Sequence, residues 1–191
     1  MSPNGEEEKM LLGFLTLIGT ASQNGYIGAI LITDVQGIPQ EFRCTHPVKP
    51  TAIQKPLYGD ALEPFIGINL CGVPLIKKIE NRPTVIVVNR DYLMAIRDDT
   101  SPPVIFIRRA GQAIDIKNHE GAIEKKRRIR VECGTGRFQP IILESKPDYE
   151  DDITTAMGIL ENIFNYFDLL EPFDRITQAI QLLVKQDKRF Q

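Results

Sequence analysis

Apolar runs separated by turn residues dominate the first part of the chain, and they predict β-strands. Residues 11–18 and 26–33 are almost wholly apolar, and residues 38–44 alternate between polar and apolar side chains. The turn between the second and third segments is Asp-Val-Gln-Gly at 34–37, where Asp can bond its own backbone and Gly tolerates positive φ. Two strands around such a turn indicate a β-hairpin.

Prolines break the pattern in the middle of the chain. Thr51 can cap a helix, and the apolar spacing over residues 57–66 is partly helical. Pro56, Pro64 and Pro74 interrupt this segment, because proline lacks the backbone N–H that a helix interior needs. The pattern therefore predicts short or kinked helices instead of one long rod.

The next apolar segments predict the rest of a sheet. Residues 84–88 and 104–107 are short and nearly all apolar, which is typical of buried strands. Residues 129–133 alternate in polarity, and residues 138–143 return after a Gly-Thr-Gly turn. This arrangement predicts a second hairpin.

Helical periodicity takes over near residue 148. Acidic residues 150–152 suit a helix N-terminus, and an apolar stripe follows at helical spacing. Pro172 suits the first turn of a second helix, which ends among basic residues. The sequence thus predicts an α+β fold with a mostly antiparallel sheet, two β-hairpins, proline-kinked central helices and two C-terminal amphipathic helices. We expect a sheet domain over 1–147 and a helical pair over 148–191, packed on or beside it.

Composition excludes disorder and gives no global attraction to nucleic acid. The chain has 191 residues, of which 42% are hydrophobic and 25% charged, and its net charge is −2. Charge is uneven, however: residues 108–137 hold nine basic and four acidic side chains, and residues 144–174 hold nine acidic side chains and one lysine. These runs indicate either solvated faces or a bipolar surface that docks partners.

The chain start and the cysteines indicate a cytoplasmic protein. Residues 2–9 are polar and acidic, unlike a signal peptide, and no apolar run approaches the roughly 20 residues that span a membrane. Cys44, Cys71 and Cys133 are odd in number and widely spaced, which argues against a disulfide framework and against zinc. We expect no cofactor, no metal and no membrane partner.

A proline-rich loop after the first hairpin is the leading candidate for ligand binding. Its side chains would suit an anionic partner, and the prolines would lower the entropy lost on binding. The alternative is a rigid connector with solvated side chains. The candidate residues are Arg43, His46, Lys49, Lys55 and Tyr58.

The Glu144-Ser145-Lys146 sequence follows the apolar run 140–143 and resembles the E-x-K half-motif of the PD-(D/E)xK nuclease family. The resemblance covers about residues 127–167. It implies a metal-dependent nuclease in which carboxylates hold Mg²⁺ and the lysine steadies the nucleophile. Glu132 would supply the second carboxylate, where the family usually has Asp. A strand end with a solvated ion pair is the alternative.

One basic cluster could contact a phosphate backbone, which would give salt-sensitive and sequence-blind binding. An edge strand protected by charge is the alternative, and no aromatic residues are interleaved to stack bases. The cluster consists of Lys125, Lys126, Arg127, Arg128 and Arg130.

The C-terminal helices carry more apolar side chains than one stripe needs. Phe164, Phe167, Leu170 and Phe173 either cap the sheet or form a protein interface. Since no catalytic constellation is legible, the first functional prediction is a non-catalytic protein-interaction subunit of a cytoplasmic complex, compatible with a homo-oligomer. The alternatives are the metal-dependent nuclease and a nucleic-acid backbone-binding accessory protein.

Overall fold

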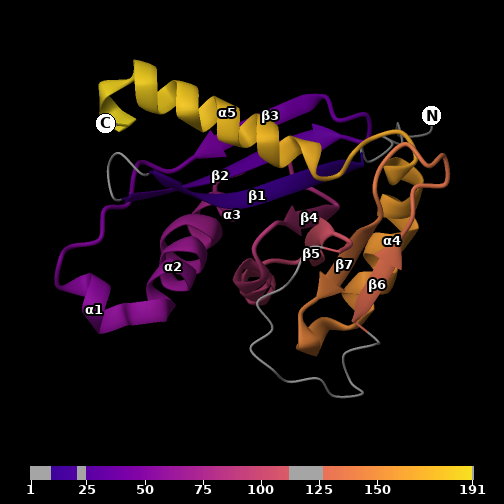
Figure 1. The fold of residues 1–191 in the computed structure, drawn as a ribbon, viewed down its shortest axis with the longest axis horizontal. Coiled ribbons are helices and arrows are strands. Elements are labelled where there is room, and N and C mark those ends of the chain that lie inside the picture. The colour runs from indigo at the N-terminus through magenta and orange to yellow at the C-terminus, as the bar shows by residue number, and fades with distance from the viewer. Residues whose placement is uncertain (1–9, 21–24, 112–126, 191) are drawn as a thin grey trace, which may run out of the picture.

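A sheet of seven strands forms the centre of the described part of the chain (Figure 1). The computed structural model describes residues 10–20, 25–111 and 127–190. The strands are β1 (Leu11–Thr20), β2 (Gly25–Asp34), β3 (Pro39–Cys44), β4 (Val85–Val88), β5 (Val104–Arg109), β6 (Arg128–Val131) and β7 (Ile141–Ser145).

The strand order is β3-β2-β1-β4-β5-β7-β6. Both hairpins are confirmed, since β2 pairs antiparallel with β3 and β6 pairs antiparallel with β7. In the first hairpin, the backbone N–H groups of Gln36 and Ile38 donate to the Asp34 carboxylate, and Gly37 has a φ of 80°. The centre differs from the rest: β4 lies parallel to both β1 and β5. The predicted α+β fold with a mostly antiparallel sheet is confirmed.

The prolines divide the middle of the chain into short helices, as predicted. A π-helix within this region was not predicted, and residues 91–99 form a 3-10 helix. The elements here are α1 (Gln54–Tyr58), η1 (Gly59–Ala61), α2 (Leu62–Phe65), the π-helix η2 (Ile66–Gly72), α3 (Val73–Ile76) and η3 (Asp91–Asp99). The C-terminal part contains η5 (Pro147–Tyr149), α4 (Asp151–Phe164), α5 (Glu171–Gln186) and η6 (Lys188–Phe190).

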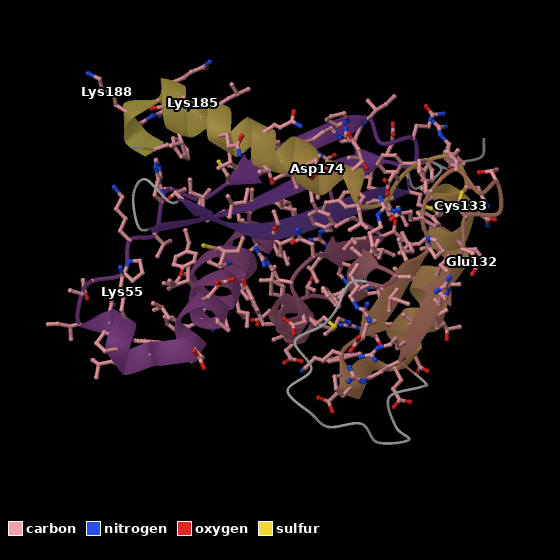
Figure 2. All side chains as sticks on the ribbon, in the orientation of Figure 1. Lys55, Glu132, Cys133, Asp174, Lys185 and Lys188 are labelled. Atoms are coloured by element: carbon pink, nitrogen blue, oxygen red, sulfur yellow. The ribbon has the colours of Figure 1, made fainter. Side chains whose placement is uncertain are left out.

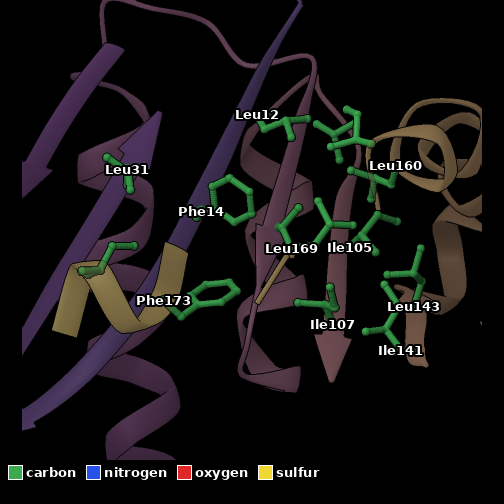
Figure 3. Close-up of a cluster of buried hydrophobic side chains, with 14 of the residues drawn as sticks. Leu12, Phe14, Leu31, Ile105, Ile107, Ile141, Leu143, Leu160, Leu169 and Phe173 are labelled. Atoms are coloured by element: carbon green, nitrogen blue, oxygen red, sulfur yellow. The ribbon is translucent and has the colours of Figure 1, made fainter. Parts of the chain in front are cut away.

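Both faces of the sheet are packed, but by different elements. Helices α4 and α5 cover one face and close the larger hydrophobic cluster, which Figure 3 shows in part. In it, the Phe14 ring meets the rings of Phe167 and Phe173 edge-on, with centroids 6.3 and 5.8 Å apart. The opposite face packs against η2, α3 and η3 over the strands β1, β2, β4 and β5.

The residues predicted as a protein interface lie in the larger cluster. Phe164 is fully buried and Phe173 is 5% exposed, while Phe167 and Leu170 are half-buried against the same core. Packing on the sheet therefore accounts for all four. The division of the chain at residue 148 stays a prediction.

No helix in the described residues combines the length and the apolar character that a membrane crossing requires.

Candidate functional site

Three strands at one end of the sheet bring arginines from distant parts of the chain onto one face. Arg108 of β5 pairs with Ile142 of β7, and Ile142 pairs in turn with Arg130 of β6. On the next rung, Glu144 of β7 pairs with Phe106 on one side and Arg128 on the other. Paired residues share a face, so these side chains all lie on the side opposite α4.

The alternating neighbours on these strands confirm which side faces the core. Ile107, Leu143 and Ile129 form the rung between, and they pack in the cluster with α4. On the other side, Arg130 has a side chain 55% exposed and Arg128 one that is 33% exposed. We call Arg108, Arg128, Arg130 and Ile142 the arginine face.

Edge protection explains only part of this surface. Strand β6 lies at the edge of the sheet, so charge on Arg128 and Arg130 also suits the predicted alternative of a protected edge strand. Strand β5, however, lies in the sheet interior between β4 and β7, and an interior strand has no edge to protect. Arg108 therefore needs another explanation.

Glu144 lies beneath this surface and is held by two arginines. It is 6% exposed. Arg127 Nη1 donates to its Oε1 at 2.8 Å and Arg128 Nε donates to its Oε2 at 3.0 Å. Burial lowers the pKa of Arg108, and the nearby positive charge of Arg128 lowers it further, with Glu144 opposing the change. Positive charge is thus crowded on the face, and an anion beside Arg108 would be stabilised.

The structure does not bring the nuclease-like residues together. Glu132 lies four residues beyond the strand partner of Glu144, roughly 13 Å along the strand. Its carboxylate accepts from Arg130, while Lys146 Nζ donates to Asp98 at 2.5 and 2.6 Å. Within the described ranges, no three His, Cys, Asp or Glu side chains cluster closely enough to hold a metal ion. These residues do not fit the Mg²⁺ site that the resemblance implies.

The proline-rich loop does not form one site either. Arg43 binds Glu41 and Glu80, and His46 stacks on Phe190 with ring centroids 5.3 Å apart. Lys55 lines a cavity of about 560 Å³ beside the end of β1, whereas Arg43 lines a different cavity of about 460 Å³.

The remaining residues of the proline-rich loop, Tyr58 and Lys49, do not complete a binding site either. The Tyr58 ring packs on the Phe65 ring with centroids 5.1 Å apart, and Lys49 is already engaged in another contact within the protein. Figure 2 shows Lys55 at the opposite end of the molecule from Glu132, which follows β6. The loop and the arginine face are therefore separate surfaces. Of the basic cluster, Lys125 and Lys126 lie outside the described residues.

Two polar pairs that the sequence did not indicate lie near the point where the parallel pairing of β1 with β4 ends. The Thr16 hydroxyl of β1 donates to Asn89 Oδ1 just after β4, at 2.7 Å. Nearby in the chain, the Tyr92 hydroxyl donates to Glu63 at 2.8 Å. Burial raises the pKa of Tyr92, and its hydrogen bond to the Glu63 carboxylate adds to that rise.

Cys133 differs from the other two cysteines. The pKa of its thiol is lowered to about 7, first because of the Thr135 hydroxyl at 3.0 Å and then because of backbone N–H groups of the following turn. Burial instead raises the pKa of the Cys44 and Cys71 thiols.

Comparison with known proteins gives remote structural similarities alone. No family model matches the chain, and no curated protein matches it. Endonuclease V from Ciona intestinalis, as a D234N variant with inosine-containing DNA, is 10% identical, with a TM-score of 0.49 and coverage of 91% of this chain and 87% of that one. Endonuclease V from Bacillus subtilis is 13% identical, with a TM-score of 0.47 and coverage of 92% and 82%. Argonaute from Marinitoga piezophila with guide RNA is 13% identical, with a TM-score of 0.39 and coverage of 83% and 26%.

These comparisons contradict the first functional prediction. The similar structures include Endonuclease V enzymes, and against this finding the prediction of a non-catalytic protein-interaction subunit is wrong. The two nucleic-acid alternatives fit better. At these identities and TM-scores the similarity transfers no activity to this chain. The cytoplasmic location and the homo-oligomer stay predictions.

Proposed function

We propose that this chain binds nucleic acid through its phosphate backbone, and that the arginine face is the binding surface. The observation that carries the proposal is the rung in which Arg108 and Arg130 flank Ile142. Arg108 comes from an interior strand, so protection of a sheet edge does not account for its charge on this face. Arginine is suited to phosphate because its planar guanidinium donates to two oxygens at once.

The spacing of the arginines suits several phosphates. Neighbouring strands lie about 4.8 Å apart, so the backbones at Arg108 and Arg130, two strands apart, are about 10 Å from each other. Arg128 and Arg130 are two residues apart on β6, about 7 Å along the strand. Glu144 accepts from Arg127 and Arg128, and Glu132 accepts from Arg130, so three arginines bind two carboxylates at this end of the sheet, and Arg108 adds a fourth positive charge beside them.

The test is a salt titration of binding to a fluorescent oligonucleotide, followed by anisotropy. We expect a Kd on the order of 10⁻⁶ to 10⁻⁴ M, typical of sequence-independent contacts. If three arginines each neutralise one phosphate, the plot of log affinity against log salt concentration has a slope of about −2 for a single strand. The double variant Arg128→Gln/Arg130→Gln should reduce that slope to about −0.7.

A charge-matched control separates the arginine face from general attraction. The double variant Lys55→Gln/Lys188→Gln also removes two positive charges, but from the opposite end of the molecule (Figure 2). It should leave the slope unchanged, and because Lys55 belongs to the predicted binding loop, it tests that loop as well. Equal losses in the two double variants, or no binding at about 50 mM salt, would refute the proposal.

The same reactions with added Mg²⁺ test the nuclease alternative. Glu144→Gln removes a buried negative charge from the arginine face, so backbone binding should become tighter in this variant. Cleavage by the wild-type chain that disappears in both Glu144→Ala and Lys146→Ala would instead support the metal-dependent nuclease. Far-UV circular dichroism of each variant checks that it folds.

A further inference from the structure

The centre of the arginine face is apolar. Ile142 is half-buried between Arg108 and Arg130, and the half-buried Phe106 of β5 lies on the same side of the sheet. Contacts to phosphate alone need only positive charge. A surface with an apolar middle and cations on two sides suits a ligand that presents phosphate and apolar groups side by side.

Single-stranded nucleic acid has that character, and a duplex does not. In a duplex the bases are stacked inside and the outer surface is phosphate and sugar. In a single strand the bases can turn outward and pack on apolar or aromatic side chains or on arginine guanidinium planes. We therefore propose that the arginine face prefers single-stranded over duplex nucleic acid, with Ile142 contacting a base or sugar. This inference rests on the proposed function.

Glu144 determines which part of the face the strand uses. Its carboxylate lies on the rung beside Phe106 and Arg128, where it would repel phosphate. The neighbouring rung holds two arginines, and the acid that reaches it is Glu132, which accepts from Arg130 at 3.2 Å but has a side chain that is 69% exposed to solvent. A bound strand therefore crosses the sheet along Arg108, Ile142 and Arg130, with phosphate on the arginines and a base or sugar between them.

The test compares one DNA sequence of about 20 nucleotides as a single strand and as a duplex, by anisotropy at constant salt. A base or sugar that packs on Ile142 adds a contact that the duplex does not make, so we expect the single strand to bind roughly tenfold more tightly. Ile142→Ala should weaken single-strand binding about fivefold and leave duplex binding unchanged, whereas Ile142→Leu should retain the preference. Ile38→Ala, in the exposed turn of the first hairpin, is the matched control and should change neither.

The outcomes separate the two proposals. Equal affinities, or tighter duplex binding, would overturn the single-strand preference while backbone binding still holds. Equal weakening of both ligands by Ile142→Ala would overturn the role of Ile142. Absence of binding to either ligand would overturn both proposals. Thermal unfolding of the Ile142 variants shows whether a loss of affinity reflects a loss of folded protein.

Discussion

A buried ion pair fixes the start of α4 to η3, and its removal gives a quantitative test of the structure. Arg97 Nε donates to Asp152 Oδ2 at 2.6 Å and Arg97 Nη2 donates to Oδ1 at 3.2 Å. The two side chains are 17% and 9% exposed. Arg97 also donates to the Thr100 carbonyl at 2.7 Å, and its guanidinium lies 4.2 Å from the centre of the Tyr149 ring.

Asp152→Ala should destabilise the protein by about 3 kcal/mol, since removing one partner of a buried pair costs about 3–5 kcal/mol and this pair keeps some contact with water. For a chain of this size that corresponds to a fall in Tm of about 6–12 °C. Arg97→Met should cost about 1 kcal/mol more, because the bond to the Thr100 carbonyl is lost as well. The double variant should cost less than the sum of the two, by about 2 kcal/mol.

Urea denaturation followed by circular dichroism measures these free energies of unfolding. Asp151→Ala is the matched control: it removes an exposed carboxylate from the same helical turn and should cost under about 1 kcal/mol. An Asp152→Ala effect within the error of this control would refute the reasoning. So would additive single variants, because then no coupling joins the two side chains.

Two further predictions concern a close contact and a thiol. Gly28→Ala should destabilise the fold by about 1–3 kcal/mol, because the new Cβ would lie 2.4 Å from Cys71 Cβ; Gly19→Ala in β1 meets no atom within 4 Å and should be harmless in the same denaturation assay. Cys133 is only 7% exposed, so its alkylation should be slow, but its lowered pKa should place the midpoint of the rate against pH near 7; the rate for Cys44, whose pKa burial raises, should climb only at higher pH. A Cys133 midpoint at about 8.5 would match an ordinary thiol and count against the hydrogen bonds of its turn.

Local chemistry explains which elements the sequence could predict. The first hairpin follows from the Asp34 carboxylate and the positive φ of Gly37, both within the turn itself. The short central helices follow from proline spacing. The insertion of β4 between β1 and β5 depends on packing between residues about 70 positions apart. No local sequence pattern indicates this strand pairing, so the parallel centre of the sheet was not predicted.

The candidate site also depends on pairing between strands that are distant in sequence, which local patterns do not indicate. The sequence places Arg128 and Arg130 in one basic run but does not connect Arg108 to them. The three residues come together only because β7 pairs with β5 on one side and with β6 on the other. Phe106 and Ile142 were missed for the same reason: they are separated from the basic run in sequence and lie beside it in the sheet. The absence of interleaved aromatic residues along the run therefore said little about the surface.

Glu144 shows why a short motif was a poor guide to chemistry here. In sequence it stands two residues before a lysine, as in a metal-binding half-motif. In the fold its two oxygens accept from Arg127 and Arg128, and the lysine binds Asp98. A carboxylate between two guanidinium groups is already neutralised, so a cation would have to displace both arginines. The same bonds hold the middle of the basic run against β7, and the charge that faces outward comes from Arg130 together with Arg108. Glu144 therefore offsets part of the charge of Arg127 and Arg128, and the proposed phosphate contacts depend most on Arg108 and on Arg130, whose partner Glu132 is 69% exposed.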